Sequence, residues 1–209
     1  MTFKAVKVWD PLVRIFHWSL VSLFLIAYAT EDDFLSFHVV AGYLICGLIA
    51  FRLIWGVIGS RHARFTDFVK SPKEIKAYIK DVLLFRAKHY LGHNPAGGAM
   101  VIALLLSITV TLITGMLTYG ATEFSGPLAI WTTSVGDHTA DFFEETHEFF
   151  ANFTVLLVVM HVAGVMIASL QHRENLVRSM IDGDKYIKTT HTSTQTESPK
   201  TDSKQEVMQ

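Results

Sequence analysis

Four histidines in this sequence have positions suited to binding metal inside a membrane. His147 and His161 are fourteen residues apart within one apolar stretch. On a helix with 3.6 residues per turn, this spacing places the two imidazoles within about 40° of each other and roughly 21 Å apart along the axis. Ionisable groups at membrane depth are costly, and imidazole is a common ligand of haem iron. The pair therefore predicts two haems stacked along one membrane helix.

His17 and His38 are the expected partners of this pair. His17 lies near the inner end of the first apolar stretch, and His161 lies on the inner half of the fourth. His38 lies about one turn into the second stretch, at a depth similar to that of His147. We therefore expect one bis-imidazole site on each side of the membrane. The other histidines fall in connections or in the tail and are interpreted as ordinary polar residues: His62, His89, His93, His138, His172 and His191.

An alternative register remains open for the fourth stretch. His172 is eleven residues after His161 and therefore returns to nearly the same helical face. His172 lies outside the apolar run. This position favours His147 and His161, rather than His161 and His172, as the two ligands on this helix.

The elements that must position these histidines are four long apolar stretches. The chain has 209 residues, of which 50% are hydrophobic and 18% charged, and its mean hydropathy is positive. The stretches at about 12–30, 36–58, 99–120 and 145–170 are each long enough to cross the hydrocarbon as a helix. They lack the polar stripe of a helix on the surface of a soluble protein. The sequence predicts an all-α membrane protein, a four-helix transmembrane bundle that spans about 1–188.

The charged residues are divided between the two sides of these stretches. Lysine and arginine occur only in the N-terminal segment, between Arg52 and Lys88, and from Arg173 onward. The connections at 31–37 and 121–146 contain none and carry several carboxylates. By the positive-inside rule, both termini are expected in the cytoplasm.

The N-terminal segment has one other interpretation. Lys4, Lys7 and Arg14 followed by an apolar run resemble a cleavable signal peptide, but cleavage would remove His17. The single cysteine, Cys46, excludes intramolecular disulfides and covalent attachment of c-type haem through a Cys-x-x-Cys-His motif.

The basic connection between the second and third stretches contains its own helix signal. Ser71, Pro72 and Glu74 form a capping box with proline at the first helical position. Apolar residues then recur at three- and four-residue spacing, with lysines on the other side. We expect an amphipathic helix on the cytoplasmic membrane surface; a helix packed on the loop itself is the alternative. From about residue 189 the tail is polar and is expected to be disordered.

Several other residues could support the haem sites. Gly42 and Gly164 could let a flat macrocycle approach the backbone, although close helix packing explains them equally well. Arg52, fourteen residues after His38, could pair with a propionate of the inner haem or extend to the cytoplasmic surface. The outer haem has no lysine or arginine on its side. The hydroxyls of the third stretch could bond the ligand histidines or their own preceding carbonyls, and these are Ser107, Thr109, Thr111, Thr114 and Thr118.

These residues and their surroundings resemble the bacterial cytochrome b561 and nickel-hydrogenase b-type cytochrome subunit family, which is related to the membrane subunits of formate dehydrogenases. The similarity covers about 8–188. The matching segments are VWDP at 8–11, RIFHW at 14–18, RLIWGVIGSRHARF at 52–65, YLGHNPAGGA at 90–99 and HRENL at 172–176.

The resemblance implies a four-helix bundle in the bacterial inner membrane that binds two haem b groups, with a quinone site on the cytoplasmic side. In the formate dehydrogenase relatives an Asn-Ala-Gly segment borders the quinone. The similar residues here are Asn94 and Gly97, separated by an inserted Pro95, and His93 is a further candidate. Family members serve hydrogenases, dehydrogenases and small c-type cytochromes, so the redox partner stays open among these.

The sequence therefore predicts a diheme b-type cytochrome that transfers electrons between the quinone pool and a partner on the acidic periplasmic face. Bis-histidine ligation leaves neither iron open to oxygen, which favours electron transfer. Membrane lipid is an expected partner and nucleic acid is not, while a homo-oligomer stays open. Two alternatives remain: a quinone-coupled superoxide oxidase, and a transporter with a histidine-lined path for metal ions or protons.

Overall fold

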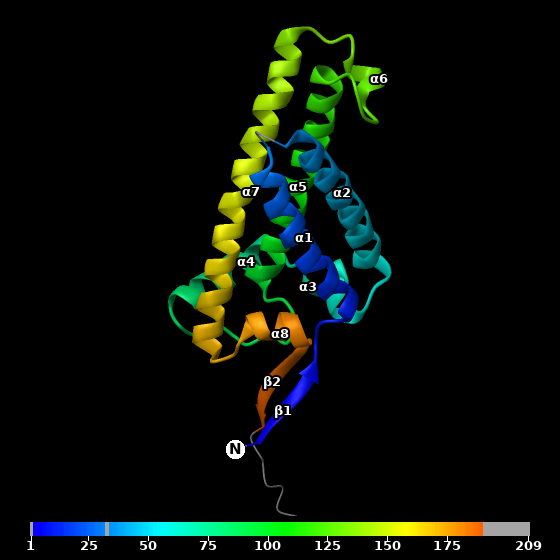
Figure 1. Cartoon of the computed structure of the whole chain (residues 1–209). Helices are drawn as coiled ribbons and strands as arrows, with labels where there is room; N and C mark the ends of the chain where they lie inside the picture. Colours follow the sequence, from blue (N-terminus) through cyan, green and yellow to red (C-terminus); the bar gives the residue numbers. More distant parts are fainter. Residues whose placement is uncertain (1, 32–33, 190–209) are drawn as a thin grey trace, which may run out of the picture.

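Four long helices dominate the computed structural model, which describes residues 2–31 and 34–189 (Figure 1). They are α1 (Pro11–Ala29), α2 (Leu35–Ile58), α5 (Pro95–Thr122) and α7 (Asp137–His172), and each is long and apolar enough to cross a membrane. The predicted four-helix bundle is therefore confirmed.

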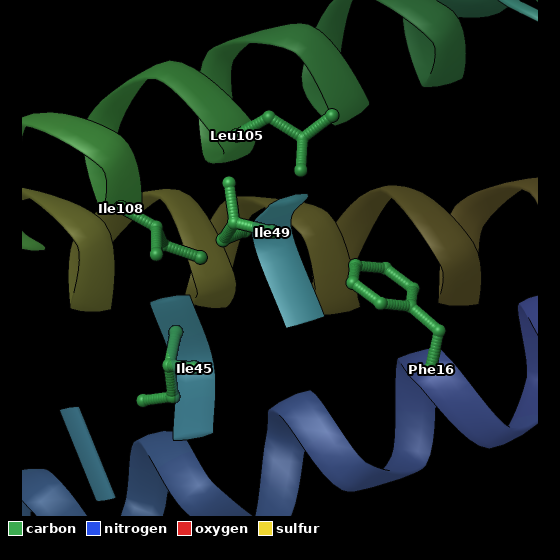
Figure 2. Packing of buried hydrophobic residues seen from close by; sticks show 5 residues of the cluster. All are labelled: Phe16, Ile45, Ile49, Leu105 and Ile108. Carbon is green, nitrogen blue, oxygen red and sulfur yellow. The ribbon is translucent and has the colours of Figure 1, made fainter. Parts of the chain in front are cut away.

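The core of the bundle is small and lies where α1, α2 and α5 meet. Figure 2 shows its buried side chains, which are Phe16, Ile45, Ile49, Leu105 and Ile108. Many other large apolar side chains point outward; Leu25 and Val159, for example, are each 61% exposed. An apolar exterior is what a bundle surrounded by lipid requires, because lipid tails are as apolar as the side chains that face them.

The helices are arranged as two closely packed pairs, α1 with α2 and α5 with α7. The α5–α7 seam contains a buried polar contact, in which the hydroxyls of Ser107 and Thr154 lie 2.7 Å apart. Thr154 has no exposed surface, and its hydroxyl also donates to the carbonyl of Phe150 at 2.8 Å. Small hydroxyl residues let two membrane helices approach closely and bond across the interface.

The outer connection is shorter than the sequence pattern predicts. Helix α7 begins at Asp137 rather than at about residue 145, and α5 continues to Thr122, so a connection of 123–136 with the short helix α6 (Ala129–Thr132) replaces the predicted 121–146. Both helices extend beyond the turn that joins α1 to α2 (Figure 1). Hydropathy marks the apolar part of a helix, whereas the polar start of α7 is set by backbone hydrogen bonding.

The predicted amphipathic helix of the basic connection between α2 and α5 is present as α4 (Pro72–Leu83). The Ser71 hydroxyl accepts from the backbone N–H of Glu74 at 3.3 Å and donates to its carboxylate at 2.7 Å. Tyr78 is buried, whereas Leu83 is exposed. The short elements η1 (Arg61–Ala63) and α3 (Phe65–Phe68) link α2 to this helix. Contact of α4 with the membrane surface stays a prediction.

A two-stranded sheet joins the two ends of the described chain. The sequence analysis did not predict this sheet. Strand β1 (Thr2–Lys7) pairs antiparallel with β2 (Asp184–Thr189), in the register Thr2 to Thr189 and Lys7 to Asp184. The helix α8 (Leu176–Asp182) precedes β2 and ends at Gly183, whose φ of 92° requires the left-handed region that glycine tolerates. The predicted disordered tail lies, beyond residue 189, outside the described residues.

Asp10 ties the start of α1 to the end of α2. Its Oδ1 accepts from the backbone N–H of Val13 at 2.9 Å, and its Oδ2 accepts from Trp55 Nε1 at 3.2 Å and from the Ser60 hydroxyl. Burial acts to raise the pKa of Asp10, but hydrogen bonds from Ser60, Val13 and Trp55 outweigh it and hold the pKa below its usual value.

Replacing this carboxylate tests its role in stability. D10A removes both the helix cap and the link to α2, and we expect it to lower the free energy of unfolding by about 1–2 kcal/mol. The D10N variant keeps an oxygen that can cap α1 and should lose less. Unfolding of the purified protein in detergent, followed by circular dichroism, measures both. Equal stability of D10A and wild type would contradict this role.

Candidate functional site

The structure brings His38 and His147 together at the end of the bundle that the sequence predicts to be the outer one. His38 lies on the first turns of α2 and His147 lies on α7, and both are half-buried. Their ring centroids are 5.9 Å apart, with the ring planes inclined at 76°.

Both outer imidazoles are oriented by backbone carbonyls. His38 Nδ1 lies 2.9 Å from the carbonyl oxygen of Ala27, and His147 Nδ1 lies 2.9 Å from that of Thr111. A carbonyl can only accept, so Nδ1 of each ring carries the proton and donates it. Nε2 of each ring then has a free lone pair, which is the arrangement of a metal-binding histidine.

The threonine hydroxyls of α5 bond the preceding carbonyls of their own helix. They do not bond the ligand histidines, which was the other role considered for them. Thr109, Thr111, Thr114 and Thr118 donate to the carbonyls of Leu105, Ser107, Val110 and Thr114 at 2.7 to 3.0 Å. Helical threonines commonly make this bond to the preceding turn. The Thr111 carbonyl, rather than its hydroxyl, meets His147.

Gly115 is a residue of the outer site that the sequence analysis missed. A Cβ at this position would lie 2.7 Å from His147 Cε1 and 2.9 Å from its Nδ1, closer than van der Waals contact allows. Only glycine therefore lets α5 approach the imidazole of α7 this closely. By contrast, a Cβ on Gly42 or Gly164 would meet nothing within 4 Å. The space beside these two glycines is open.

His17 and His161 lie together on the inner side. Their ring centroids are 6.5 Å apart and their planes are inclined at 54°. The Trp18 ring stands at right angles to His17 at 5.1 Å. His17 Nδ1 is buried and has no hydrogen-bond partner among the residues that the structure describes.

The two pairs fit a metal held between imidazoles. A metal ion bound by two histidine nitrogens at about 2 Å each places the ring centroids about 6 Å apart. The observed separations of 5.9 and 6.5 Å agree with this value. The alternative register is not adopted, because the His172 ring, at the C-terminal end of α7, lies 5.3 Å from that of His89. The same helix thus presents His147 and His161 to partners at two depths.

Arg52 is buried near the C-terminal end of α2, next to α3. It is only 3% exposed, so its side chain does not extend to the protein surface. Its guanidinium carbon lies 4.9 Å from the centroid of Phe65 and 5.9 Å from that of Phe68. Its Nη1 atom is buried and makes no hydrogen bond within the described part of the chain. A buried cation with an unpaired N–H can bind an anionic or carbonyl oxygen.

The imidazole of His93 is enclosed, although the residue as a whole is half-buried. Its ring lies 4.7 Å from both Trp9 and Phe68, and its Nδ1 has no hydrogen-bond partner in the described residues. Burial lowers the pKa of His93 to about 3, and the charge of Arg52 acts in the same direction. Phe68 therefore separates two buried groups, Arg52 and His93, that each have an unused nitrogen.

The other residues predicted near a quinone lie at the start of α5. The Asn94 side chain caps this helix, because its Oδ1 accepts from the backbone N–H of Gly97 at 2.7 Å. The next residue, Gly98, packs directly on the backbone of Phe68, since a Cβ there would lie 2.5 Å from the Phe68 carbonyl oxygen. The cap and this contact fix the start of α5 next to His93.

Comparison with known proteins gives a consistent result. The model of the prokaryotic cytochrome b561 family matches residues 8–183. A probable Ni/Fe-hydrogenase B-type cytochrome subunit of Rhizobium leguminosarum bv. viciae is 25% identical over 88% of this chain and 90% of its own length. Proteins with the same description from Azotobacter vinelandii and Azotobacter chroococcum mcd 1 are each 25% identical over 86% of this chain and 88% of their own. No solved structure matches.

The contact between Gly115 and His147 can be tested with an alanine variant. In G115A the added methyl group must displace the imidazole, and overpacking of this kind costs about 1–3 kcal/mol. We expect a lower haem content and a changed absorption spectrum for the outer site. G47A is the matched control, because Gly47 lies on the exposed face of α2 with nothing within 4 Å of an added Cβ. A G115A spectrum identical to that of wild type would contradict the contact.

Proposed function

Because this chain belongs to the prokaryotic cytochrome b561 family, we propose that it holds two haem b groups and transfers electrons between membrane quinone and a partner on the periplasmic face. The coarser conclusion follows from the family and the four apolar helices: the protein is a multi-pass membrane b-type cytochrome. One observation carries the finer proposal. Two imidazole pairs, each with the spacing of a bis-histidine iron site, lie at two depths along α7.

In this proposal His17 and His161 hold the inner haem, and His38 and His147 hold the outer haem. Haem iron supplies one-electron chemistry when it is bound. Two imidazoles at each site would leave a bound iron no open position for oxygen, which favours electron transfer. The carbonyls of Ala27 and Thr111 keep the outer ligands in one tautomer and one orientation. Two sites roughly 21 Å apart along α7 would cover most of the hydrocarbon thickness.

Arg52 is proposed to bind a propionate of the inner haem. Its depth on α2, its burial and its unpaired Nη1 support this role. A buried guanidinium without an anion is unfavourable, and a carboxylate would compensate its charge. The outer side has no described lysine or arginine near His38 or His147, so its propionates would rely on backbone donors, water or a partner.

The quinone is proposed to bind next to His93, Asn94 and Gly97, close to the inner haem. An apolar groove of about 280 Å³ between α2, α3 and α5 supports lateral access from the bilayer. Phe65 belongs both to this groove and to the wall around Arg52. The groove residues are Leu53, Phe65, Ile102, Leu105, Leu106 and Thr109.

The charge distribution supports a proposal for the membrane orientation and for the kind of partner. Both termini are proposed to lie in the cytoplasm of a bacterium, with α6 and the acidic start of α7 in the periplasm. Ile130 and Trp131 of α6 are 80% and 70% exposed and would form an apolar contact surface among the carboxylates. The names of the relatives favour a hydrogenase subunit as the partner. A dehydrogenase subunit or a c-type cytochrome with a basic surface would fit the same face.

Haem content of single histidine variants tests the ligand assignment. Pyridine haemochrome analysis of the purified protein should give about two b haems per chain. Each of H17A, H38A, H147A and H161A should lose one of them, since one imidazole cannot keep the iron six-coordinate. H62A is the control, because His62 pairs with Asp67 at 3.0 Å on the cytoplasmic side. Full haem content in both variants of either pair would rule out that pair.

A further inference from the structure

A cluster of charged and titratable side chains lies on the cytoplasmic side, outside both imidazole pairs. Glu174 follows the end of α7, and its Oε1 lies 2.8 Å from His89 Nε2. Its Oε2 lies 4.0 Å from Lys185 Nζ, on β2. The ring of His172 lies 5.3 Å from that of His89. We refer to His89, His172, Glu174 and Lys185 as the Glu174 cluster.

The cluster is incompletely bonded, and all of its members except the exposed His89 are buried or half-buried. Lys185 is 6% exposed and donates to the Tyr90 carbonyl at 3.0 Å. Glu174 Oε2 is buried and has no hydrogen bond to any described residue, since Lys185 lies beyond bonding distance. Burying charges is costly, and an apolar pair could hold β2 against the loop after α4 without that cost. Stability alone therefore does not explain the charged residues of the cluster. A carboxylate with one unused oxygen, next to two imidazoles and an amine, can accept and release protons.

A cavity connects the cluster to the protein surface. It has a volume of about 190 Å³, which is enough for several water molecules, and Glu174 and Lys185 both line it. Its other lining residues include Arg173 and Asn175, which are exposed. Water in this cavity would therefore reach the Glu174 carboxylate from the cytoplasmic side.

The loop that follows α4 leads from the cluster to the proposed quinone site. His89 and Tyr90 contact Glu174 and Lys185, whereas His93, three residues after Tyr90, is buried beside Phe68. The charge of Lys185 also acts on His93. Asp67 is the carboxylate whose charge acts on His93, but it is paired with His62 at 3.0 Å and with Arg61 at 3.9 Å. Glu174 is therefore the favoured carboxylate for proton transfer.

We propose that the Glu174 cluster and its cavity form the proton path between the cytoplasm and the quinone, with Glu174 as the proton-transfer residue. This inference rests on the proposed quinone function. Reducing one quinone to its quinol takes two protons and two electrons, and the inner haem, when bound, would supply the electrons one at a time. Both protons come from cytoplasmic water through Glu174, which is reprotonated after each transfer. Quinol oxidation runs the same path outward, with two protons released and two electrons passed to haem.

Reoxidation of the reduced holoprotein by a short-chain ubiquinone tests the path. The haems are reduced with dithionite, and stopped-flow absorbance follows their oxidation in H₂O and in D₂O. In E174Q we expect oxidation to slow by at least about tenfold, with a larger solvent isotope effect, because a positioned proton donor is lost. Azide, a small weak acid, should restore much of the rate. Haem content, the absorption spectrum and oxidation by ferricyanide, which takes no protons, should match wild type.

Other variants separate this role from a structural one. E174D should keep part of the rate. D81N, which changes a carboxylate that is paired with Arg86 at 3.0 Å outside the cavity, should behave as wild type. If E174Q does not accumulate with full haem content, H89Q is the second test and should show the same slow, azide-sensitive oxidation.

The outcomes distinguish this inference from the proposed function. Suppose that ubiquinone oxidises the wild-type haems and that E174Q or H89Q has the wild-type rate and isotope effect. The proposed proton path is then overturned, whereas the reaction with quinone stands. A slow D67N together with a normal E174Q would place proton entry at Asp67 and would also overturn it. If ubiquinone does not oxidise wild-type haems although ferricyanide does, the quinone function itself fails.

Discussion

The rotational position of α7 is the constraint on which the rest of the structure depends. This helix carries one histidine of each pair, so a rotation of one residue, about 100°, would separate both pairs at once. Its contacts with α5 prevent such a rotation. The Ser107–Thr154 hydroxyl contact, the bond from His147 to the Thr111 carbonyl and the close approach at Gly115 all lie along this seam. These polar and steric contacts matter because lipid provides little hydrophobic force between helices.

The two sides of the bundle offer different surroundings to a bound group. The outer imidazoles are held by backbone carbonyls, and the outer connections carry carboxylates without lysine or arginine. On the inner side lie a buried guanidinium, an enclosed imidazole and the Glu174 cluster, which the proposed orientation places within reach of the cytoplasm. Under the proposed function this asymmetry separates the tasks: electron exchange with a protein on the outside, and electron and proton exchange with quinone on the inside.

The sequence predicts the parts of this structure that depend on strong local signals. Long apolar stretches set the four helices, the capping box at Ser71 sets α4, and helical periodicity places the four histidines at matching depths. Other features depend on contacts between distant segments. Strands β1 and β2 are short and pair the two ends of the chain, His93 is buried only because Trp9 and Phe68 enclose it, and Gly115 matters only because His147 faces it. Glu174 follows the last apolar helix, and nothing in the neighbouring sequence distinguishes it from an ordinary solvent-exposed glutamate.

The proposed ligation is tested most directly by electron paramagnetic resonance of the oxidised full-length protein, combined with carbon monoxide binding to the reduced form. Two bis-histidine haems should give only low-spin ferric signals that account for all the bound haem, and carbon monoxide should not bind. A high-spin ferric signal in the intact protein, or stoichiometric carbon monoxide binding at either haem, would show an open axial position. Either result would contradict the pairing of His17 with His161 and of His38 with His147.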